Sequence, residues 1–193
     1  AYILVTLVGD SEAELTAKMD RLGELAEKCG AYDTLVVWTD GLKKDVWAAR
    51  SAFLTVIEAD TKLLDELDVV VPVDRIAEFL VYTRAAGKAE GIAIRNFGHA
   101  GDGNVHLCVV RGERDEETWQ RELHENMDRA YAEAYRLGGV ASGEHGIGLS
   151  KRPYFLRQTA KENLQAMNAI KTALDPQHIL NNGKSYLTGG NNN

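Results

Sequence analysis

The sequence contains few cysteines, few prolines and no long apolar run. Of its 193 residues, two are cysteines and three are prolines. Two cysteines cannot build the disulfide framework of a small secreted domain, so Cys29 and Cys108 are predicted to be reduced, buried thiols of a cytoplasmic protein. No apolar run approaches the roughly 20 residues that a membrane-spanning helix needs. The composition therefore excludes disulfide-rich scaffolds and predicts no transmembrane segment.

The sequence also lacks a basic patch. It has 22 Lys and Arg residues against 29 Asp and Glu residues, a formal net charge of −7. This acidic balance argues against a nucleic-acid partner. The hydrophobic fraction of 45% is that of an ordinary globular protein. Because the chain opens inside an apolar run and ends in GGNNN, we expect residues 1–188 to be a fragment of a longer polypeptide and residues 189–193 to be a disordered tail.

Hydrophobic periodicity predicts a mixed α+β fold. The first third is expected to contain strands at 2–8 and 34–38 and helices at 12–28 and 42–58. The following elements are expected to be a strand at 68–73, a helix at 73–88, strands at 92–97 and 104–111, a helix at 115–137 and a short strand at 139–141. Helices at 151–159 and 161–174 follow. The central order β-α-β-β-α-β is the split βαβ, or ferredoxin-like, pattern with an antiparallel sheet. The first third would supply part of a second such unit.

One stretch, GHAGDGNVH at 98–106, gathers polar side chains around a glycine-rich turn. Strand alternation places Asn104 and His106 on one face, and His99, at the end of the preceding strand, can reach the same side. A single histidine is more often structural, and Asp102 can simply form an Asx turn. Two histidines flanking this turn, together with a second motif downstream, favour a functional site.

That second motif is GGVASGEHGIG at 138–148, which carries Glu144 and His145. Adjacent residues of an extended loop point in opposite directions, so one could bind a metal while the other faces a substrate. His99, His106 and Glu144 together would form a His₂-carboxylate site that keeps positions open for substrate or water. His145 would remain available as a general base. The alternative is a glycine-rich turn with a surface Glu-His pair.

Arg50 is the candidate for gripping a carboxylate. It follows Trp47 on the predicted inner side of a helix, where a partly buried guanidinium suits bidentate binding. The alternative is an arginine that extends to solvent or pairs with a nearby acid.

Three segments, GHAGDGNVH, SGEHGIG followed by Lys151, and LDPQHILNNGK, resemble signatures of the FAD-linked oxidase C-terminal domain. This domain is the substrate side of flavin-dependent 2-hydroxyacid dehydrogenases, such as glycolate oxidase, D-lactate dehydrogenase and D-2-hydroxyglutarate dehydrogenase. The resemblance covers nearly the whole chain. It implies a duplicated ferredoxin-like fold that caps an FAD held mainly by a separate N-terminal domain, which is absent here.

The resemblance also implies roles for individual residues. His99, His106 and Glu144 would be ligands of a divalent metal ion (zinc, manganese or iron), and His145 would take the substrate hydroxyl proton. The substrate contacts would be Asn104 and Arg50, and Asn181 would lie in the segment that approaches the flavin ring.

Two departures from the family pattern bear on these roles. Asn182 stands where the family usually has proline, which loosens the turn beside Asn181. Members that act on dicarboxylic acids tend to carry a lysine before the strand that ends at Pro72. Residues 63–72 contain no basic residue, which favours a monocarboxylate such as lactate or glycolate.

The implied activity is oxidation of a 2-hydroxy acid to a 2-keto acid with hydride transfer to FAD, in a fragment that is inactive alone. The implied partner is an electron-accepting protein or a quinone, with the protein cytoplasmic or peripheral to the membrane through a partner. A homodimer and a heteromeric complex both stay open. Two other interpretations of the same residues are a metal-dependent hydrolase and a non-catalytic ferredoxin-like ligand-binding module.

Overall fold

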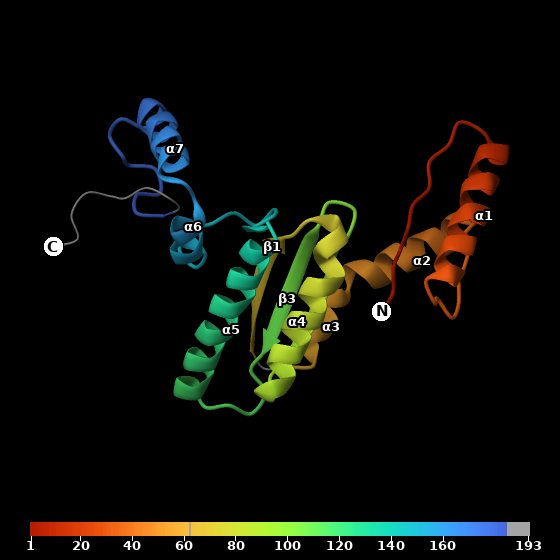
Figure 1. Cartoon of the computed structure of the whole chain (residues 1–193), viewed down its shortest axis with the longest axis horizontal. Helices are drawn as coiled ribbons and strands as arrows, with labels where there is room; N and C mark the ends of the chain where they lie inside the picture. The colour runs from red at the N-terminus through yellow and green to blue at the C-terminus, as the bar shows by residue number, and fades with distance from the viewer. Residues whose placement is uncertain (62, 185–193) are drawn as a thin grey trace. The chain divides into compact units, whose positions relative to one another are not determined.

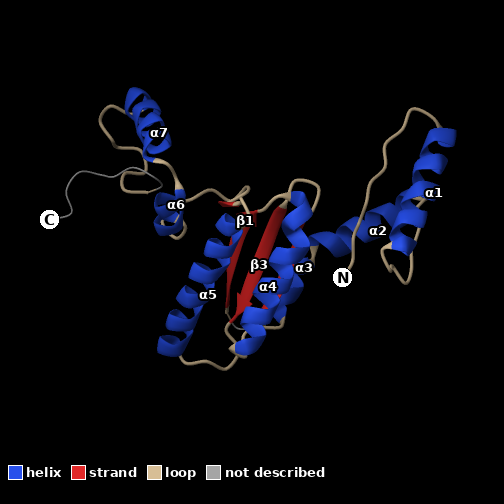
Figure 2. Cartoon of the chain, viewed as in Figure 1, coloured by secondary structure: helices blue, strands red, loops and turns tan. Residues whose placement is uncertain are grey.

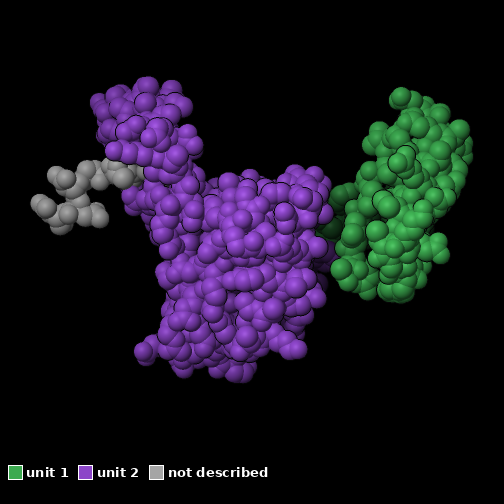
Figure 3. Space-filling view, in the orientation of Figure 1, with its two compact units in different colours: residues 1–51 green, residues 52–193 purple. Residues whose placement is uncertain are grey.

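The computed structural model describes residues 1–61 and 63–184. The chain divides into two compact units, residues 1–51 and residues 52–193, which Figure 3 colours separately. Each unit is described by itself. The predicted tail at 189–193 lies outside the described residues.

The first unit contains two helices, α1 (Glu12–Lys28) and α2 (Asp40–Ser51). The Ser11 hydroxyl caps α1 by accepting the N–H of Glu14 at 3.2 Å, and the Glu14 carboxylate accepts the N–H of Asp10 at 2.9 Å. Gly30, with φ of 82°, follows the last turn. The helix predicted at 12–28 is therefore confirmed, and its end signals act as the sequence indicates.

The two strands predicted in this unit are wrong. Residues 2–8 and 34–38 form no strand, and the sheet of the described residues does not include them. An apolar run becomes a strand only where a neighbour takes up its backbone N–H and C=O groups. Tyr2 and Ile3 are 93% and 81% exposed. The structure thus shows one β-α-β-β-α-β unit, and the duplication implied by the resemblance stays a prediction.

The second unit is built on a four-stranded antiparallel sheet (Figure 2). Its strands are β1 (Leu64–Val70), β2 (Ala93–His99), β3 (Asn104–Val110) and β4 (Val140–Ala141), in the order β2-β3-β1-β4. The helices are α3 (Phe53–Ala59), the 3₁₀ turn η1 (Val73–Arg75) with α4 (Ile76–Ala89), and α5 (Glu116–Arg136). This confirms the predicted α+β class and the split βαβ order. β1 begins at Leu64 instead of Asp68 because its polar first half still pairs with β3.

The core lies between the sheet and the helices α4 and α5 (Figure 1). The side chains of Leu67, Val69 and Leu107 point from the sheet toward Phe79 of α4 and Trp119 of α5, and all five are almost fully buried. Because strand residues alternate, the residues between these apolar ones point to the opposite face of the sheet. That face carries the candidate site.

The chain ends in two helices, α6 (Arg152–Gln158) and α7 (Lys161–Leu174), as the sequence predicts. After α7, the Asp175 carboxylate accepts the N–H groups of Ile179 and Leu180 at 3.1 and 3.0 Å and pairs with Lys171. One acid therefore organises the turn of the third signature segment.

The two thiols differ in their surroundings. Cys108 is buried in β3, as predicted, and burial raises the pKa of its thiol to about 12. Cys29 is exposed, so its predicted burial is wrong. No described helix has the length and hydropathy needed to span a membrane.

The turn between β2 and β3 depends on glycine at position 103. Its φ is 82°, and a Cβ there would lie 2.0 Å from the carbonyl oxygen of Val71. Gly103→Ala should therefore lower the free energy of unfolding by about 2 kcal/mol or more, because a non-glycine residue is strained in this region and the backbone contact cannot yield. Gly101→Ala is the matched control, since a Cβ at Gly101 meets nothing within 4 Å. Urea unfolding measures both, and equal losses would contradict the account.

Candidate functional site

The candidate site lies on the face of the sheet opposite α4 and α5. In the register, His106 of β3 lies between Phe97 of β2 and Asp68 of β1. His99 pairs with Asn104 one step further along. Directly paired residues project to the same face, so the hairpin brings both predicted histidines and the asparagine together. This confirms the placement that strand alternation predicts.

The three predicted metal ligands converge. His106 Nε2 lies 3.0 Å from Glu144 Oε1, and His99 Nε2 lies 3.6 Å from the same oxygen. One donor atom from each residue lies within 4.8 Å of the other two. The His106 side chain is only 3% exposed, whereas those of His99 and Glu144 are 47% and 49% exposed. One ligand of the group is therefore buried, and the other two form a side of the group that is open to solvent.

This geometry fits a divalent cation. Donor atoms about 2.1 Å from one tetrahedral ion lie about 3.4 Å apart, close to the two separations from Glu144. Two imidazoles and one carboxylate suit zinc, manganese or iron and leave coordination positions open. The exposed side of the group is where those positions would face.

Asp68, which sequence reasoning did not single out, holds the loop that carries Glu144. Its fully buried carboxylate accepts the N–H groups of Gly143, Glu144 and His145 at 3.0, 3.1 and 2.8 Å. It also accepts the hydroxyl of Ser142 at 2.7 Å. A carboxylate that receives this many donors fixes the backbone on both sides of the ligand. The only sequence signal for this role was the position of Asp68, an acid directly before the apolar run VVVP at 69–72.

The environment of Asp68 keeps it ionised. Burial by itself would raise the pKa of this carboxyl, but hydrogen bonds from His145 N–H, the Ser142 hydroxyl and neighbouring N–H groups hold it well below its usual range. The ammonium of Lys151, itself buried, lies 3.4 Å away. Ser142 is held at φ of 83°, a strained conformation for a non-glycine residue.

Gly143 permits the close approach of this loop to the hairpin. A Cβ at position 143 would lie 2.8 Å from the Asn104 side chain and 2.7 Å from that of Val70.

Asn104 is buried, and its Oδ1 has no hydrogen-bond partner among the described residues. Asp102 accepts the Asn104 N–H at 3.2 Å, so it forms the predicted turn. Asn104 therefore lies packed beneath the loop, on the same face as the ligand group.

His145 does not point away from the ligand group. Its ring stacks on that of His106, with centroids 4.8 Å apart and an angle of 22° between the planes. Its Nε2 is 4.0 Å from Glu144 Oε1, and its side chain is 42% exposed. The candidate base therefore lies directly beside the group that would bind the metal, within reach of a molecule held there.

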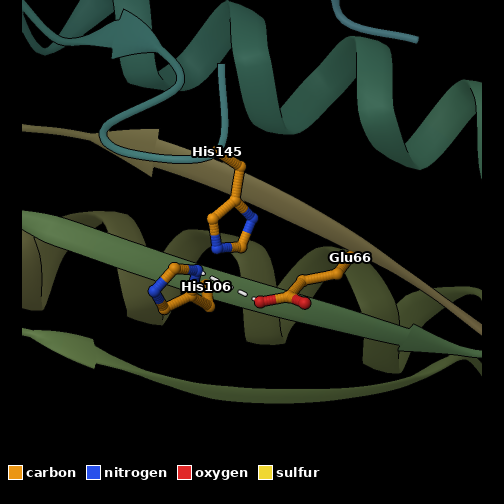
Figure 4. Close-up of side chains that lie close together, drawn as sticks. All are labelled: Glu66, His106 and His145. Atoms are coloured by element: carbon orange, nitrogen blue, oxygen red, sulfur yellow. Dashed lines mark ion pairs between the residues drawn. The ribbon is translucent and has the colours of Figure 1, made fainter. Parts of the chain in front are cut away.

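Glu66 is a further member of the site that sequence reasoning missed. Its Oε1 lies 3.1 Å from His106 Nδ1, the ring nitrogen opposite the one near Glu144. Figure 4 shows Glu66, His106 and His145 converging, and one donor atom from each lies within 4.8 Å of the other two. Strand alternation places Glu66 on the same polar face as Asp68. Because the strand was predicted to begin at Asp68, Glu66 fell outside it and its place on this face was missed.

Two other predicted residues belong to segments outside the sheet that carries this group. Arg50 lies half-buried in the last turn of α2, in the first unit. Asn181 lies in the turn after α7 with φ of 49°, where its side chain contacts Lys184. Their predicted contacts with substrate and flavin stay predictions. Trp47 is 51% exposed and does not belong to a core.

The chain belongs to a family of flavoenzymes. Residues 1–185 match the family model described as FAD linked oxidases, C-terminal domain. It is therefore part of an FAD-linked oxidoreductase family, as the three signature segments indicated.

Several curated proteins are similar to this chain. A D-lactate dehydrogenase of Anaerostipes hadrus is 44% identical over 184 residues, covering 95% of this chain and 39% of the relative. The glycolate oxidase subunit GlcD of Bacillus subtilis is 31% identical over 200 residues, covering 96% of this chain and 42% of the relative. A D-lactate dehydrogenase of Archaeoglobus fulgidus is 34% identical over 187 residues, covering 95% and 39%. The chain thus spans about two fifths of the length of these relatives.

Removing the Asp68 charge should destabilise the protein most at neutral pH. Asp68→Asn should cost about 2–4 kcal/mol of unfolding free energy at pH 7, because Lys151 and several N–H groups lose a buried anionic partner. Because the folded pKa is depressed, this stabilisation is complete above the ordinary Asp pKa of about 3.9 and is lost as the pH falls further. Urea unfolding at pH 7 and pH 2.5 should show the gap to wild type narrowing at acid pH. Asp74→Asn, at an exposed acid of η1, is the control, and a gap independent of pH would contradict the account.

Proposed function

We propose that this chain is the substrate- and metal-binding part of a flavin-dependent 2-hydroxyacid dehydrogenase or oxidase of the glycolate or D-lactate type. The reaction would convert a 2-hydroxy acid to a 2-keto acid and pass the reduced flavin's electrons to a protein or quinone. The observation that carries the proposal is the convergence of His99, His106 and Glu144 beside His145 in a chain of the FAD-linked oxidase family. D-lactate dehydrogenases and a glycolate oxidase component among the relatives support the substrate class.

The ligand group would hold one divalent cation on the open side of the sheet. When bound, the cation supplies polarisation of the substrate hydroxyl, and FAD, held mainly by residues outside this chain, supplies the hydride acceptor. Side chains of this chain would carry out the other steps: they would bind the substrate, orient it and remove one proton.

His145 is the proposed base. Oxidation of the alcohol releases the hydroxyl proton and a hydride from Cα, and the proton needs an acceptor next to the ligand group. The His145 ring stands there, stacked on a metal ligand and accessible from outside. The nearby Glu144 carboxylate, 4.0 Å from Nε2, would stabilise the imidazolium that forms.

Asn104 and Arg50 are the proposed substrate contacts. Asn104 lies on the same face of the hairpin as the ligand group, and its buried position fixes the direction of the side chain that would contact the substrate. Arg50 would bind the carboxylate in a bidentate manner and so set which face of Cα is presented.

The charges at the site favour a monocarboxylate. Residues 63–72 offer no cation to pair with a second carboxylate of the substrate. The Glu66 carboxylate faces the site from β1 and would repel such a group. Lactate and glycolate therefore suit this site better than a dicarboxylic 2-hydroxy acid.

Metal binding is the first test. Wild-type protein should bind Zn²⁺ or Mn²⁺ at one site, and His106→Ala should weaken the affinity at least about 100-fold, because the buried ligand has no substitute. His124→Ala, an exposed histidine of α5, should leave it unchanged. Competition with a chromophoric chelator measures all three proteins. Equal affinity of the His106 and His124 variants would remove the proposed ligand set.

Flavin reduction is the second test. In the full-length flavoprotein, anaerobic mixing with D-lactate or glycolate should reduce the flavin, and His145→Ala should slow this step about 10²- to 10⁴-fold, because the hydroxyl proton loses its acceptor. Stopped-flow absorbance measures the rate of flavin reduction, with His124→Ala as the control.

Two results would contradict this assignment. A rate of flavin reduction in His145→Ala equal to that of wild type would exclude His145 as the base. Metal-dependent ester hydrolysis by the chain without flavin would instead support a hydrolase that uses the same three ligands.

A further inference from the structure

Both ring nitrogens of His106 face carboxylates. Nε2 lies 3.0 Å from Glu144 Oε1 and Nδ1 lies 3.1 Å from Glu66 Oε1. The side chain is 3% exposed, so water cannot replace either partner. His99 and His145 are more than 40% exposed and can exchange protons with solvent.

A buried histidine that binds a metal must present one particular tautomer. Neutral imidazole carries its proton on one nitrogen, and the other nitrogen supplies the lone pair to the cation. The nitrogen on the side of Glu144 and His99 is Nε2, so the proton must reside on Nδ1. A protonated Nδ1 that is buried requires an acceptor, because burying a donor without a partner is destabilising.

Glu66 is the acceptor that the fold provides. Among the described residues, Nδ1 of His106 has no aligned hydrogen bond, and the Glu66 oxygen at 3.1 Å is the acceptor recorded beside it. The terminal torsion of a glutamate is broad, so rotation of the carboxylate can align this contact at little cost. Glu66 is itself mostly buried, with a side chain 19% exposed, which strengthens the interaction.

The strand register explains why Glu66 reaches this nitrogen. Glu66 pairs with Cys108, and the next pair on the same face is Asp68 with His106. Glu66 is therefore diagonal to His106 across the two strands, a distance that a long side chain spans. The Asp68 carboxylate, directly opposite His106, already accepts N–H groups of the loop that holds Glu144. The diagonal residue Glu66 is therefore the acid of β1 whose carboxylate can accept a hydrogen bond from the ring.

We propose that Glu66 is a positioning residue for His106. Its carboxylate accepts the Nδ1 proton, fixes the Nε2 tautomer and sets the ring plane, so that the Nε2 lone pair points at the metal position beside Glu144. The His145 ring, stacked on His106, is held in place by the same arrangement. This inference rests on the proposed function, because it gives His106 the role of a metal ligand.

The experiment compares Glu66→Ala and Glu66→Gln with wild type. Asp65→Ala is the matched control, since it removes one acidic side chain from the next position of β1 on the opposite face. Two quantities are measured on each protein: the tautomer of His106 in metal-free protein by ¹⁵N NMR of the ring nitrogens, and the Zn²⁺ affinity by chelator competition. Amide spectra verify that each variant is folded.

The expected results differ between the variants. Wild-type His106 should carry its proton on Nδ1, and Glu66→Ala should lose this preference and bind Zn²⁺ about 10- to 100-fold more weakly. Glu66→Gln should keep the tautomer and lose less affinity, because its amide oxygen accepts the same proton. Asp65→Ala should match wild type in both measurements.

The failures of the two proposals are distinguishable. If wild type binds Zn²⁺ and Glu66→Ala keeps both the tautomer and the affinity, the positioning role is wrong while the metal site stands. If Glu66→Ala loses a second bound Zn²⁺ and leaves the first unchanged, Glu66 is a ligand and the positioning role is again wrong. If wild type binds no Zn²⁺, the proposed metal site fails, and an unchanged tautomer in Glu66→Ala would overturn the pairing independently.

Discussion

The site depends on one buried carboxylate in the middle of the sheet. Asp68 is fully buried, and a charge in that position is costly unless donors surround it. The donors come from the loop at 142–145 and from Lys151, so the cost of burying the charge is met only when this loop is docked. The same contacts restrain a loop whose glycines would otherwise make it conformationally free. A single electrostatic constraint thus converts a glycine-rich segment into a rigid carrier of Glu144 and His145.

The two faces of the sheet divide the remaining tasks. Apolar side chains such as Leu67 and Leu107 pack against α4 and α5 and supply the stability of the unit. The polar residues between them face the other way, where no helix of the core covers them. His99 and His106 therefore stand on strands whose geometry is set by the core, and only Glu144 is supplied by a loop. Sites built on such rigid elements keep their geometry without help from the ligand.

Local signals in the sequence predict much of this fold, while relations between distant elements escape them. The helix at 12–28 has a cap and a glycine stop, and the strand beginning at Asn104 alternates clearly, so both are predicted almost residue by residue. The strands predicted at 2–8 and 34–38 fail because an apolar run does not reveal whether a pairing partner exists. Asp68 and Glu66 were missed because their roles come from the register between β1 and β3. The role of Asn181 rests on the family resemblance alone, and that of Arg50 rests on the resemblance and on its place in a predicted helix.

The distribution of charge around the ligand group narrows what it can bind. The Asp68 charge is satisfied by backbone N–H groups and Lys151, and the Glu66 carboxylate is directed at His106 Nδ1. Glu144 is then the carboxylate of this cluster that remains to face a cation, alongside the rings of His99 and His106. A divalent ion in such a set keeps a net positive charge, which attracts one carboxylate of a substrate. If the group holds a metal ion and His145 acts as the base, as proposed, the two would act on adjacent atoms of a small anion that also carries a hydroxyl.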